Sequence, residues 1–386
     1  MKYKLGEICE IISGSTPKTG IPEYWDGTQK WITPAELNED TYIITDSIRK
    51  LTELGVEKAG LSSFPEGTVI LSSRAPIGKV AIAGCEMYCN QGFKNLICSE
   101  KINNHYLYWF LKGRTEYLNS LGRGATFKEI SKQIVSNIEI DVPPIEQQKR
   151  AVNQLEKANA IIRLRKQQLQ KLDELVKARF IELFGDSEFN TMQWPTKKLS
   201  ELCAVSSSKR VYQNEQSTEG VPFLRISDLN ERIDNVKNAP ELFIPINKYN
   251  ELKENGLVPT EGDILVTSRG TLGRCYIVRP EDEFYFQDGM ISWLSDLNSQ
   301  ITSVYLSQLF AMSGIQKQIA SLQAGSTVAY LSITMLKKLN IMLPPLDRQE
   351  QYATFVEQTD KSKVAVQKAL DEAQLLFDSL MQKYFG

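Results

Sequence analysis

The second half of the chain repeats the first half, and this duplication constrains the fold more than any other feature of the sequence. Four strings recur in the same order in both halves. The matched pairs are Lys4–Cys9 with Lys198–Cys203, Glu66–Arg74 with Glu261–Arg269, Pro143–Ile145 with Pro344–Leu346, and Phe184–Gly185 with Phe385–Gly386. The last two pairs share one offset of 201 residues, whereas the first two have shorter offsets. The halves therefore differ in length within a globular part and keep the length of the part that follows it.

Each half begins with a globular part that mixes short strands, turns and a helix. In residues 1–142, strand-like segments at 68–71 and 80–82 flank a turn, and a helix is expected at 104–120. The corresponding segments of residues 186–343 are 264–266, 275–278 and 302–321. The predicted fold class is α+β, with two similar mixed α/β domains.

A long helix is expected after each globular part, at residues 143–185 and 344–386. Between Pro144 and Phe184 there is no glycine and no further proline, and apolar residues recur every seven positions. This row is Leu155, Ile162, Leu169, Val176 and Leu183; its counterpart is Val356, Lys363, Leu370, Phe377 and Tyr384, with Lys363 as a polar break. A parallel row of Tyr352, Thr359, Val366, Ala373 and Leu380 fills part of that gap. Heptad spacing over this length predicts a coiled-coil seam.

The two seams need a partner, and the most economical partner for each helix is the other helix in antiparallel orientation. The fold would then be two similar domains separated by two long antiparallel coiled-coil helices, with an internal pseudo-two-fold repeat. The alternative is that each helix folds back onto its own globular part.

Composition places the chain among globular proteins without a general affinity for nucleic acid. The formal net charge is −2. Because nucleic-acid binding depends on lysine and arginine, any such site needs a local concentration of positive charge. The first residues lack the apolar core of a signal peptide, and no stretch reaches the ~18 apolar residues that a membrane span needs. We expect a cytoplasmic protein without a membrane partner.

The cysteines are too sparse for a disulfide scaffold, since six are spread over 386 residues. Cys85, Cys89 and Cys98 with His105, the single histidine, offer a zinc site as one interpretation. Their spacing matches no standard zinc pattern, and the neighbouring residues alternate as in a strand. Buried free thiols are the favoured interpretation, and no metal or other cofactor is expected in this chain.

The motifs of common enzyme classes are missing from the sequence. It has no Walker A loop and no Gly-x-Gly-x-x-Gly run after a strand. A histidine-dependent triad would rest on His105, which has no nucleophile motif nearby and no counterpart in the second half. The strings Val142–Ile145 and Leu343–Leu346 lack the amide or carboxylate and the aromatic residue of an amino-methyltransferase motif. We therefore expect no catalysis by this chain.

Two loops in each half combine hydroxyl, small and cationic residues in a way that suits contact with DNA. Glycine-containing turns let backbone amides approach a phosphate, and arginine adds bidentate hydrogen bonds to phosphate or guanine. The candidates in the first half are Ser73, Arg74, Lys79, Arg123, Thr126 and Lys128. The candidates in the second half are Ser268, Arg269, Thr271, Arg274, Ser326 and Thr327. The alternative is that these strings form ordinary hairpin turns, which a duplication would preserve equally well.

Together these features resemble the specificity (S) subunit of type I restriction-modification systems over essentially the whole chain. The ordered set of strings carries the resemblance, and no single string is specific. The strings are Lys4–Ile8, Gly14–Pro17, Tyr24-Trp25, Trp31-Ile32, Gly67–Lys79, Asn90–Phe93, Trp194–Leu199, the Pro-Pro-x-x-x-Gln segments Pro143–Gln148 and Pro344–Gln349, and the two Phe-Gly ends. The second half departs from the first at 206–221, where Gly14–Pro17 has no counterpart.

The resemblance implies a non-catalytic subunit that binds double-stranded DNA. Each globular part would be a target-recognition domain that reads a few base pairs, so the target would be bipartite with an unread spacer. The helices would dock two adenine-methylating modification subunits, and exposed charges such as Arg163 and Lys166 are candidates for that contact. Those partners would bring S-adenosylmethionine, and restriction subunits would join them to cut DNA with ATP and Mg²⁺.

Two other functions stay open on the sequence. One is a coiled-coil adaptor without DNA readout, which would show no sequence-dependent binding even when its partners are present. The other is a DNA methyltransferase or nuclease with unrecognised motifs, which would bind a cofactor as an isolated chain.

Overall fold

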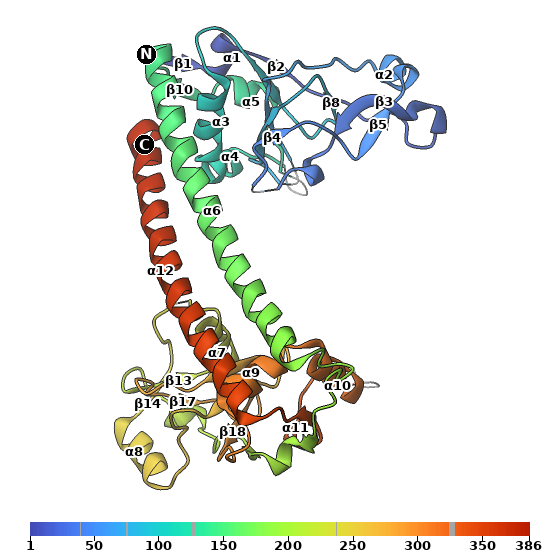
Figure 1. Ribbon diagram of the computed structural model, residues 1–386. Coiled ribbons are helices and arrows are strands. Elements are labelled where there is room, and N and C mark those ends of the chain that lie inside the picture. The colour runs from blue at the N-terminus through green and yellow to red at the C-terminus, as the bar shows by residue number, and fades with distance from the viewer. Residues whose placement is uncertain (39, 75, 125–127, 237, 324–328) are drawn as a thin grey trace. The chain divides into compact units, whose positions relative to one another are not determined.

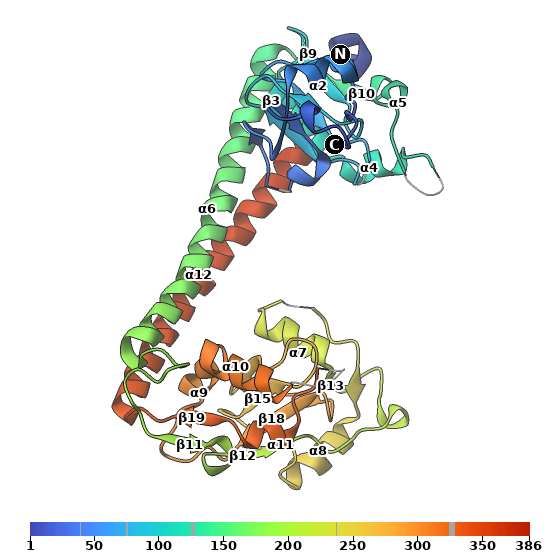
Figure 2. The same cartoon turned by 90° about the vertical axis from the view of Figure 1, so that its right-hand side faces the viewer.

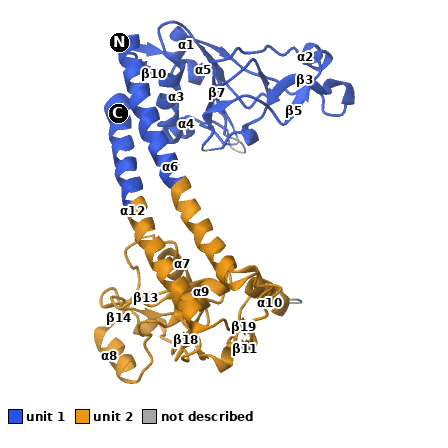
Figure 3. Ribbon diagram, viewed as in Figure 1, with its two compact units in different colours: residues 1–166, 368–386 blue, residues 167–367 orange. Residues whose placement is uncertain are grey.

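The structure, a computed structural model, describes residues 1–38, 40–74, 76–124, 128–236, 238–323 and 329–386 (Figure 1). The chain divides into two compact units: residues 1–166 with 368–386, and residues 167–367 (Figure 3). Two 40-residue helices, α6 (Ile145–Phe184) and α12 (Leu346–Phe385), are shared between the units. One end of each helix belongs to the first unit, and its other end belongs to the second unit. The unit boundaries thus fall inside these helices, and the division of the chain at 142, 185 and 343 stays a prediction.

The described part of the first unit contains two sheets and a two-stranded ribbon. The larger sheet has the order β2 (Cys9–Ile12), β9 (Asn95–Cys98), β6 (Val69–Leu71), β7 (Val80–Ala83) and β4 (Ile43–Ile44). The smaller has the order β5 (Arg49–Leu51), β3 (Trp25–Ile32) and β8 (Tyr88–Cys89), and β1 (Lys2–Lys4) pairs with β10 (Glu139–Asp141). The short helices are α1 (Leu5–Ile8), α2 (Glu53–Ala59), α3 (Asn104–Lys112), α4 (Thr115–Ser120) and α5 (Lys132–Ser136).

The second unit repeats this plan with one strand fewer among its described residues. Its larger sheet has the order β12 (Ala204–Ser206), β18 (Ile291–Ser295), β15 (Ile264–Thr267) and β16 (Cys275–Ile277). The smaller has the order β14 (Phe243–Ile244), β13 (Val221–Leu224) and β17 (Tyr285–Phe286), and β11 (Thr196–Lys198) pairs with β19 (Asn340–Met342). The short helices are α7 (Ile226–Ile233), α8 (Ile246–Glu254), α9 (Ser303–Phe310), α10 (Ser313–Leu322) and α11 (Ile333–Lys337).

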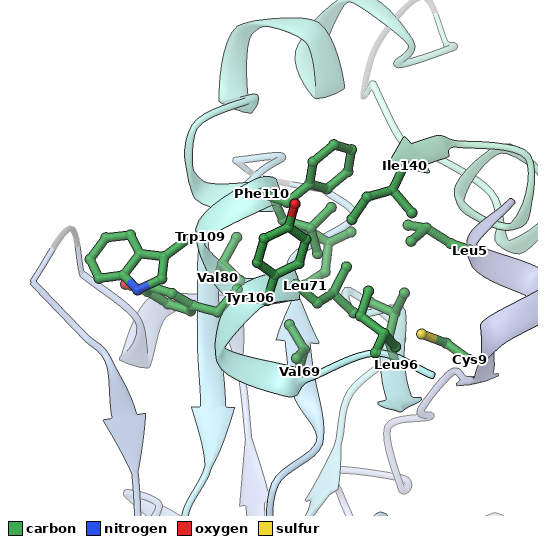
Figure 4. Close-up of a cluster of buried hydrophobic side chains, with 14 of the residues drawn as sticks. Leu5, Cys9, Val69, Leu71, Val80, Leu96, Tyr106, Trp109, Phe110 and Ile140 are labelled. Carbon is green, nitrogen blue, oxygen red and sulfur yellow. The ribbon is translucent and has the colours of Figure 1, made fainter. Parts of the chain in front are cut away.

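Both faces of the central hairpin β6–β7 are buried. Because side chains alternate along a strand, Val69 and Val80 face one apolar cluster and Ile70 and Ala81 face another. The first cluster is completed by α3, whose Tyr106, Trp109 and Phe110 cover the sheet (Figure 4). A strand covered on both faces reads as a continuous apolar run, which is why these segments stand out in the sequence.

The helix predicted at 104–120 is two helices, α3 and α4, and the one predicted at 302–321 is α9 and α10, which pack against each other (Figure 2). Gly113 lies at the first break, and Gly314 is the second residue of α10, directly after the second break. A Cβ on Gly113 would lie 2.4 Å from the Met381 Cε atom of α12, and a Cβ on Gly314 would lie 2.2 Å from the Ser187 carbonyl oxygen. Gly113 therefore permits close approach of another segment at the first break, and Gly314 does so in the first turn of α10.

The long helices pair in antiparallel orientation within each unit, as predicted. In the second unit the Tyr352 hydroxyl donates to the Val176 carbonyl at 3.3 Å, while Lys363 binds Asp173 at 2.8 Å. In the first unit the Tyr384 hydroxyl donates to Gln154 at 2.7 Å. The last turns of α12 pack on the apolar cluster of the first unit, which excludes the alternative of each helix folded only onto its own domain.

The predicted seam is buried in most places. Leu155, Ile162, Val176 and Val356 are buried, and Leu169, Leu370 and Phe377 are partly buried. In α12 the parallel row is covered more completely, since Thr359, Val366 and Ala373 are also buried. The two rows alternate at intervals of three and four residues and form one heptad seam, with Lys363 held at the polar break by its ion pair.

Candidate nucleic-acid interface

The loop between β6 and β7 is built around one hydroxyl, and the corresponding loop of the second unit is built the same way. The Ser72 hydroxyl donates to the Pro76 carbonyl at 2.7 Å and accepts from the Lys79 amide at 2.8 Å. The Thr267 hydroxyl donates to the Thr271 carbonyl and accepts from the Arg274 amide at 2.9 Å. Part of the repeated sequence is therefore explained by the construction of a turn.

Ser73 and Ser268, two of the predicted DNA contacts, are buried, so the structure gives these hydroxyls no exposed surface, and their contact with DNA stays a prediction. Their exposed fractions are 0% and 1%. The Ser73 hydroxyl accepts a hydrogen bond from Lys94 at 3.2 Å, and the Ser268 hydroxyl lies 2.8 Å from that of Ser292. A hydroxyl that is fully enclosed by protein satisfies its neighbours and does not face a ligand.

The side chains of Lys79 and Arg274 connect their loops to neighbouring segments through hydrogen bonds. The Lys79 ammonium donates to the Pro34 carbonyl at 3.1 Å and to the Leu37 carbonyl. The Arg274 guanidinium donates to Asn230 at 2.7 Å and forms an ion pair with Asp234. Both cations are already engaged by protein oxygens, so their first role is to hold the loop in place. Thr271, in contrast, is exposed.

The structure brings the two candidate loops of each unit side by side. In the first unit Arg74 and Arg123 each form a β-bridge with Glu129, so both loops share this residue. Arg123 and Lys128 are exposed, and Arg74 is partly exposed. In the second unit Arg269 forms the same bridge with Tyr330. Residues that are far apart in the sequence, such as Arg74 and Glu129 or Arg269 and Tyr330, thus form one surface. Thr126, Ser326 and Thr327 lie outside the described residues.

The paired loops differ in charge between the units. In the first unit Glu129 lies 3.7 Å from the Arg74 guanidinium and 3.1 Å from the ammonium of the buried Lys94. In the second unit the guanidinium of Arg269 lies 5.2 Å from the centroid of the Tyr330 ring. Within the described ranges Arg269 has no ion pair with a carboxylate. Its charge is thus more available to an external anion than the charge of Arg74.

Two glutamines that the sequence reasoning did not select position the long helices. Gln148 is fully buried; its carbonyl accepts from the Asn103 amide at 2.8 Å, and its amide donates to the carbonyls of Lys101 and Pro143. Gln349 makes the same three bonds to Thr302, Gln300 and Pro344 in the second unit. The signal was present in the repeated Pro-Pro-x-x-x-Gln segments. Each glutamine fixes the first turn of a long helix to the domain beside it.

The cysteines and His105 occupy separate environments. The Cys85 thiol donates to the Thr45 carbonyl at 3.2 Å, whereas burial raises the pKa of the Cys89 thiol to about 12. His105 lies 3.1 Å from Glu156 and also contacts the Tyr42 hydroxyl. Among the residues that the structure describes, no group of three or more His, Cys, Asp or Glu side chains could hold a metal ion.

Apolar side chains lie exposed on the long helices away from the seam. In the first unit these include Ile161 and Leu164 of α6, with exposed fractions of 45% and 58%, and Leu375 and Leu376 of α12, with 70% and 53%. Arg163 and Lys166 are also exposed. None of the helices in the described ranges is long and apolar enough to cross a membrane.

Known sequences match both halves of the chain. The family model described as type I restriction modification DNA specificity domain matches residues 1–174 and 192–373. The specificity subunit of the type I restriction enzyme MjaIX from Methanocaldococcus jannaschii is 29% identical over 403 residues, covering 98% of this chain and 91% of the relative. The EcoBI specificity subunit from Escherichia coli is 21% identical, covering 83% of this chain and 75% of the relative.

Solved structures show the same fold. The S subunit of a type I restriction-modification system from M. genitalium matches with a TM-score of 0.60 and 16% identity, covering 100% of this chain and 96% of that one. A second structure, concerned with complex assembly and conformational transition of the type I R-M system, matches with a TM-score of 0.59 and 17% identity, covering 100% and 97%. Since the family model matches almost all of both repeats, the chain belongs to the type I restriction modification DNA specificity domain family.

Proposed function

We propose that this chain reads a bipartite DNA target, one half-site through residues 1–142 and the other through residues 186–343, and carries no catalysis of its own. The observation that carries the proposal is the paired-loop surface, which occurs once in each repeat and presents an arginine at the same position. Arginine recognises phosphate and guanine through two parallel hydrogen bonds. The adaptor alternative assigns no role to the exposed arginines of this surface.

The contacts with DNA would come from Arg74, Arg123 and Lys128 in the first domain and from Arg269 and Thr271 in the second. These side chains are exposed or partly exposed, and they belong to loops whose backbone is fixed by hydrogen bonds. Lys79 and Arg274 would act indirectly by holding the loops. A rigid loop loses little conformational entropy on binding, which favours specific contacts.

The partners would be two DNA adenine methyltransferase subunits docked on the long helices, with restriction subunits recruited through them. Such partners would hold S-adenosylmethionine, ATP and Mg²⁺, and the complex would act on DNA in the cytoplasm. The exposed apolar residues of α6 and α12 support docking at this place, because the burial of apolar surface favours protein–protein association.

Methylation mapping tests the proposal in cells that express the modification subunit with or without this chain. We expect methyladenine at one split motif only when the chain is present. Exchange of residues 1–142 for those of a relative should change one half of the motif and leave the other half unchanged. An identical methylation pattern with and without the chain would refute the proposed function.

The docking surface makes a separate prediction for Leu164→Glu and Leu375→Glu. Each change places a charge where an apolar side chain would be buried, and loss of one such contact costs about 1.5–3 kcal/mol. We expect at least a roughly 10-fold weaker complex with the modification subunit, measured by titration of the purified subunits. Ile48→Glu is the control, since Ile48 is 86% exposed and lies outside the helices. Equal binding by all three variants would place docking elsewhere.

A further inference from the structure

Two cysteines face each other across neighbouring strands of the first unit. In the antiparallel pair β2–β9, Cys9 is directly opposite Cys98. The Ser99 amide donates to the Ile8 carbonyl at 3.0 Å, which makes Ile8 and Ser99 a hydrogen-bonded pair. Because such pairs alternate along an antiparallel ladder, Cys9 and Cys98 occupy a non-hydrogen-bonded position, where Cα atoms approach to about 4.5 Å. A disulfide spans Cα separations of about 4.4–6.8 Å.

The two thiols lie on the same face of the sheet but differ in accessibility. Cys9 is buried at the edge of the apolar cluster beside Leu96 (Figure 4), and Cys98 is partly buried against the same cluster. Cys98 also lines a cavity of about 390 Å³. Glu66 and Glu100 share the wall of this cavity, so it favours an uncharged reagent over an anionic one.

We propose that Cys9 and Cys98 are a redox-modification site, which a small uncharged disulfide converts into a cross-strand disulfide within the first domain. The Cys98 thiolate attacks one sulfur of the reagent, forms a mixed disulfide and releases one thiolate. Cys9 then loses its proton and attacks the Cys98 sulfur, which releases the second thiolate. Two protein thiols are oxidised, one reagent disulfide is reduced to two thiols, and the two protons end on those thiols.

The order of these steps follows from the environments of the two sulfurs. The hydrogen bond with Cys98 and burial both raise the pKa of the Cys9 thiol, so Cys9 is the weaker first nucleophile. Cys98 is also the one that lines the cavity. The Cα separation that is typical of a non-hydrogen-bonded pair, about 4.5 Å, lies near the lower limit for a disulfide, and a strained disulfide is reduced more readily than a structural one. The site is therefore expected to be reversible.

The duplication provides an internal control. Cys203 is the repeat counterpart of Cys9 and is likewise buried. The register of β12–β18 ends at the pair Ala204 and Ser295, and the next residues along the partner strand, Asp296 and Leu297, have no thiol. A reagent that simply opened buried cysteines would modify Cys203 as well. The proposed site predicts a cross-link between Cys9 and Cys98 and none that involves Cys203.

The test is treatment of the folded full-length chain with 2-hydroxyethyl disulfide, followed by acid quench, alkylation and peptide mapping by mass spectrometry. We expect a cross-linked peptide pair that contains Cys9 and Cys98 and has lost the mass of two hydrogen atoms. The thiols titrated after unfolding should fall from six to four. Mild reduction should restore all of them. Cys203→Ser should leave the cross-link yield unchanged, and Cys98→Ser should abolish it.

The proposal is overturned if wild-type protein retains all its thiols, or if Cys98 carries only the mixed disulfide after prolonged treatment. The first result would mean that Cys98 is not accessible, and the second that Cys9 does not reach it. Because the wild-type peptide map decides between these outcomes, the test does not depend on the folding of any variant. It is also independent of DNA binding and of the proposed function.

Discussion

Replacing Phe184 with alanine is expected to cost the second unit about 3–5 kcal/mol of folding free energy, the effect of truncating a fully buried phenylalanine. Phe184 has no exposed surface. Its ring centroid lies 4.8 Å from that of Tyr305 and 5.4 Å from that of Tyr352, both in edge-to-face geometry. These rings join α6, α9 and α12, so the cavity would open where three helices meet. A domain with about 5–15 kcal/mol of total stability would lose much of it.

The repeat supplies a matched comparison at Phe385. Phe385 is the counterpart of Phe184, and its ring centroid lies 4.9 Å from that of Tyr106, but Phe385 is only partly buried. We expect Phe385→Ala to cost clearly less than Phe184→Ala. Hydrogen exchange monitored by mass spectrometry would report each unit separately, through peptides from α9 for the second and α3 for the first. Phe189→Ala, at a residue that is 74% exposed, should leave exchange unchanged. Equal protection of the α9 peptides from hydrogen exchange in Phe184→Ala and Phe189→Ala would contradict the packing of Phe184 against Tyr305 and Tyr352.

The sequence predicted the parts of the fold that depend on pattern. The heptad rows predicted both long helices, and the apolar residues of the segments 68–71 and 264–266 predicted the central strands β6 and β15. Each of these signals is local and regular, because the long helices are covered along one face and the central strands are covered on both faces. Because of the duplication, each element predicted in the first half was also expected at the equivalent position of the second half.

The breaks in the short helices could not be predicted in the same way. Gly113 and Gly314 are single glycines, and their role depends on which distant segment approaches them. In α12 the row that contains Thr359 and Ala373 was predicted only to fill part of the gap at Lys363, because these two residues are weakly apolar, and the structure shows both of them buried. The close approaches at Gly113 and Gly314, in contrast, leave no periodic trace in the sequence.

The candidate site was identified at the level of loops and less well at the level of side chains. Serine and arginine in a turn look alike in sequence whether they face a ligand or the protein. The structure separates them, since Ser73 is enclosed and Arg269 is exposed. Glu129, which engages both Arg74 and Lys94, was missed because an isolated glutamate carries no motif. Its importance comes from its position between two loops.

Replacing Arg269 with alanine is expected to weaken target binding by roughly 5- to 150-fold, which corresponds to about 1–3 kcal/mol for one bidentate contact. Arg269 is exposed and is held over Tyr330 without a carboxylate partner in the described structure. Arg74→Ala should have a smaller effect, because Arg74 must first give up its ion pair with Glu129. Binding would be measured with the assembled complex on target and unrelated duplexes over a range of salt concentrations.

Arg279→Ala is the matched control for Arg269→Ala. Arg279 is also exposed and lies 5.8 Å from the centroid of the Tyr276 ring, but it follows β16 at the opposite end of the hairpin. Both variants remove one positive charge and one cation–aromatic contact from the same domain. A difference in DNA binding between the two variants therefore reports the position of the arginine in the domain. A general effect of net charge would weaken DNA binding by both variants equally.

The form of the loss in Arg269→Ala distinguishes what the guanidinium touches. A base contact predicts degenerate methylation at one position of the half-site read by residues 186–343, with the other half-site unchanged. A phosphate contact predicts uniformly weaker binding to all duplexes and a salt dependence reduced by about one unit of slope. If Arg269→Ala binds as wild type does, the loop is only a hairpin turn, and the readout of the second half-site must come from another face of that domain.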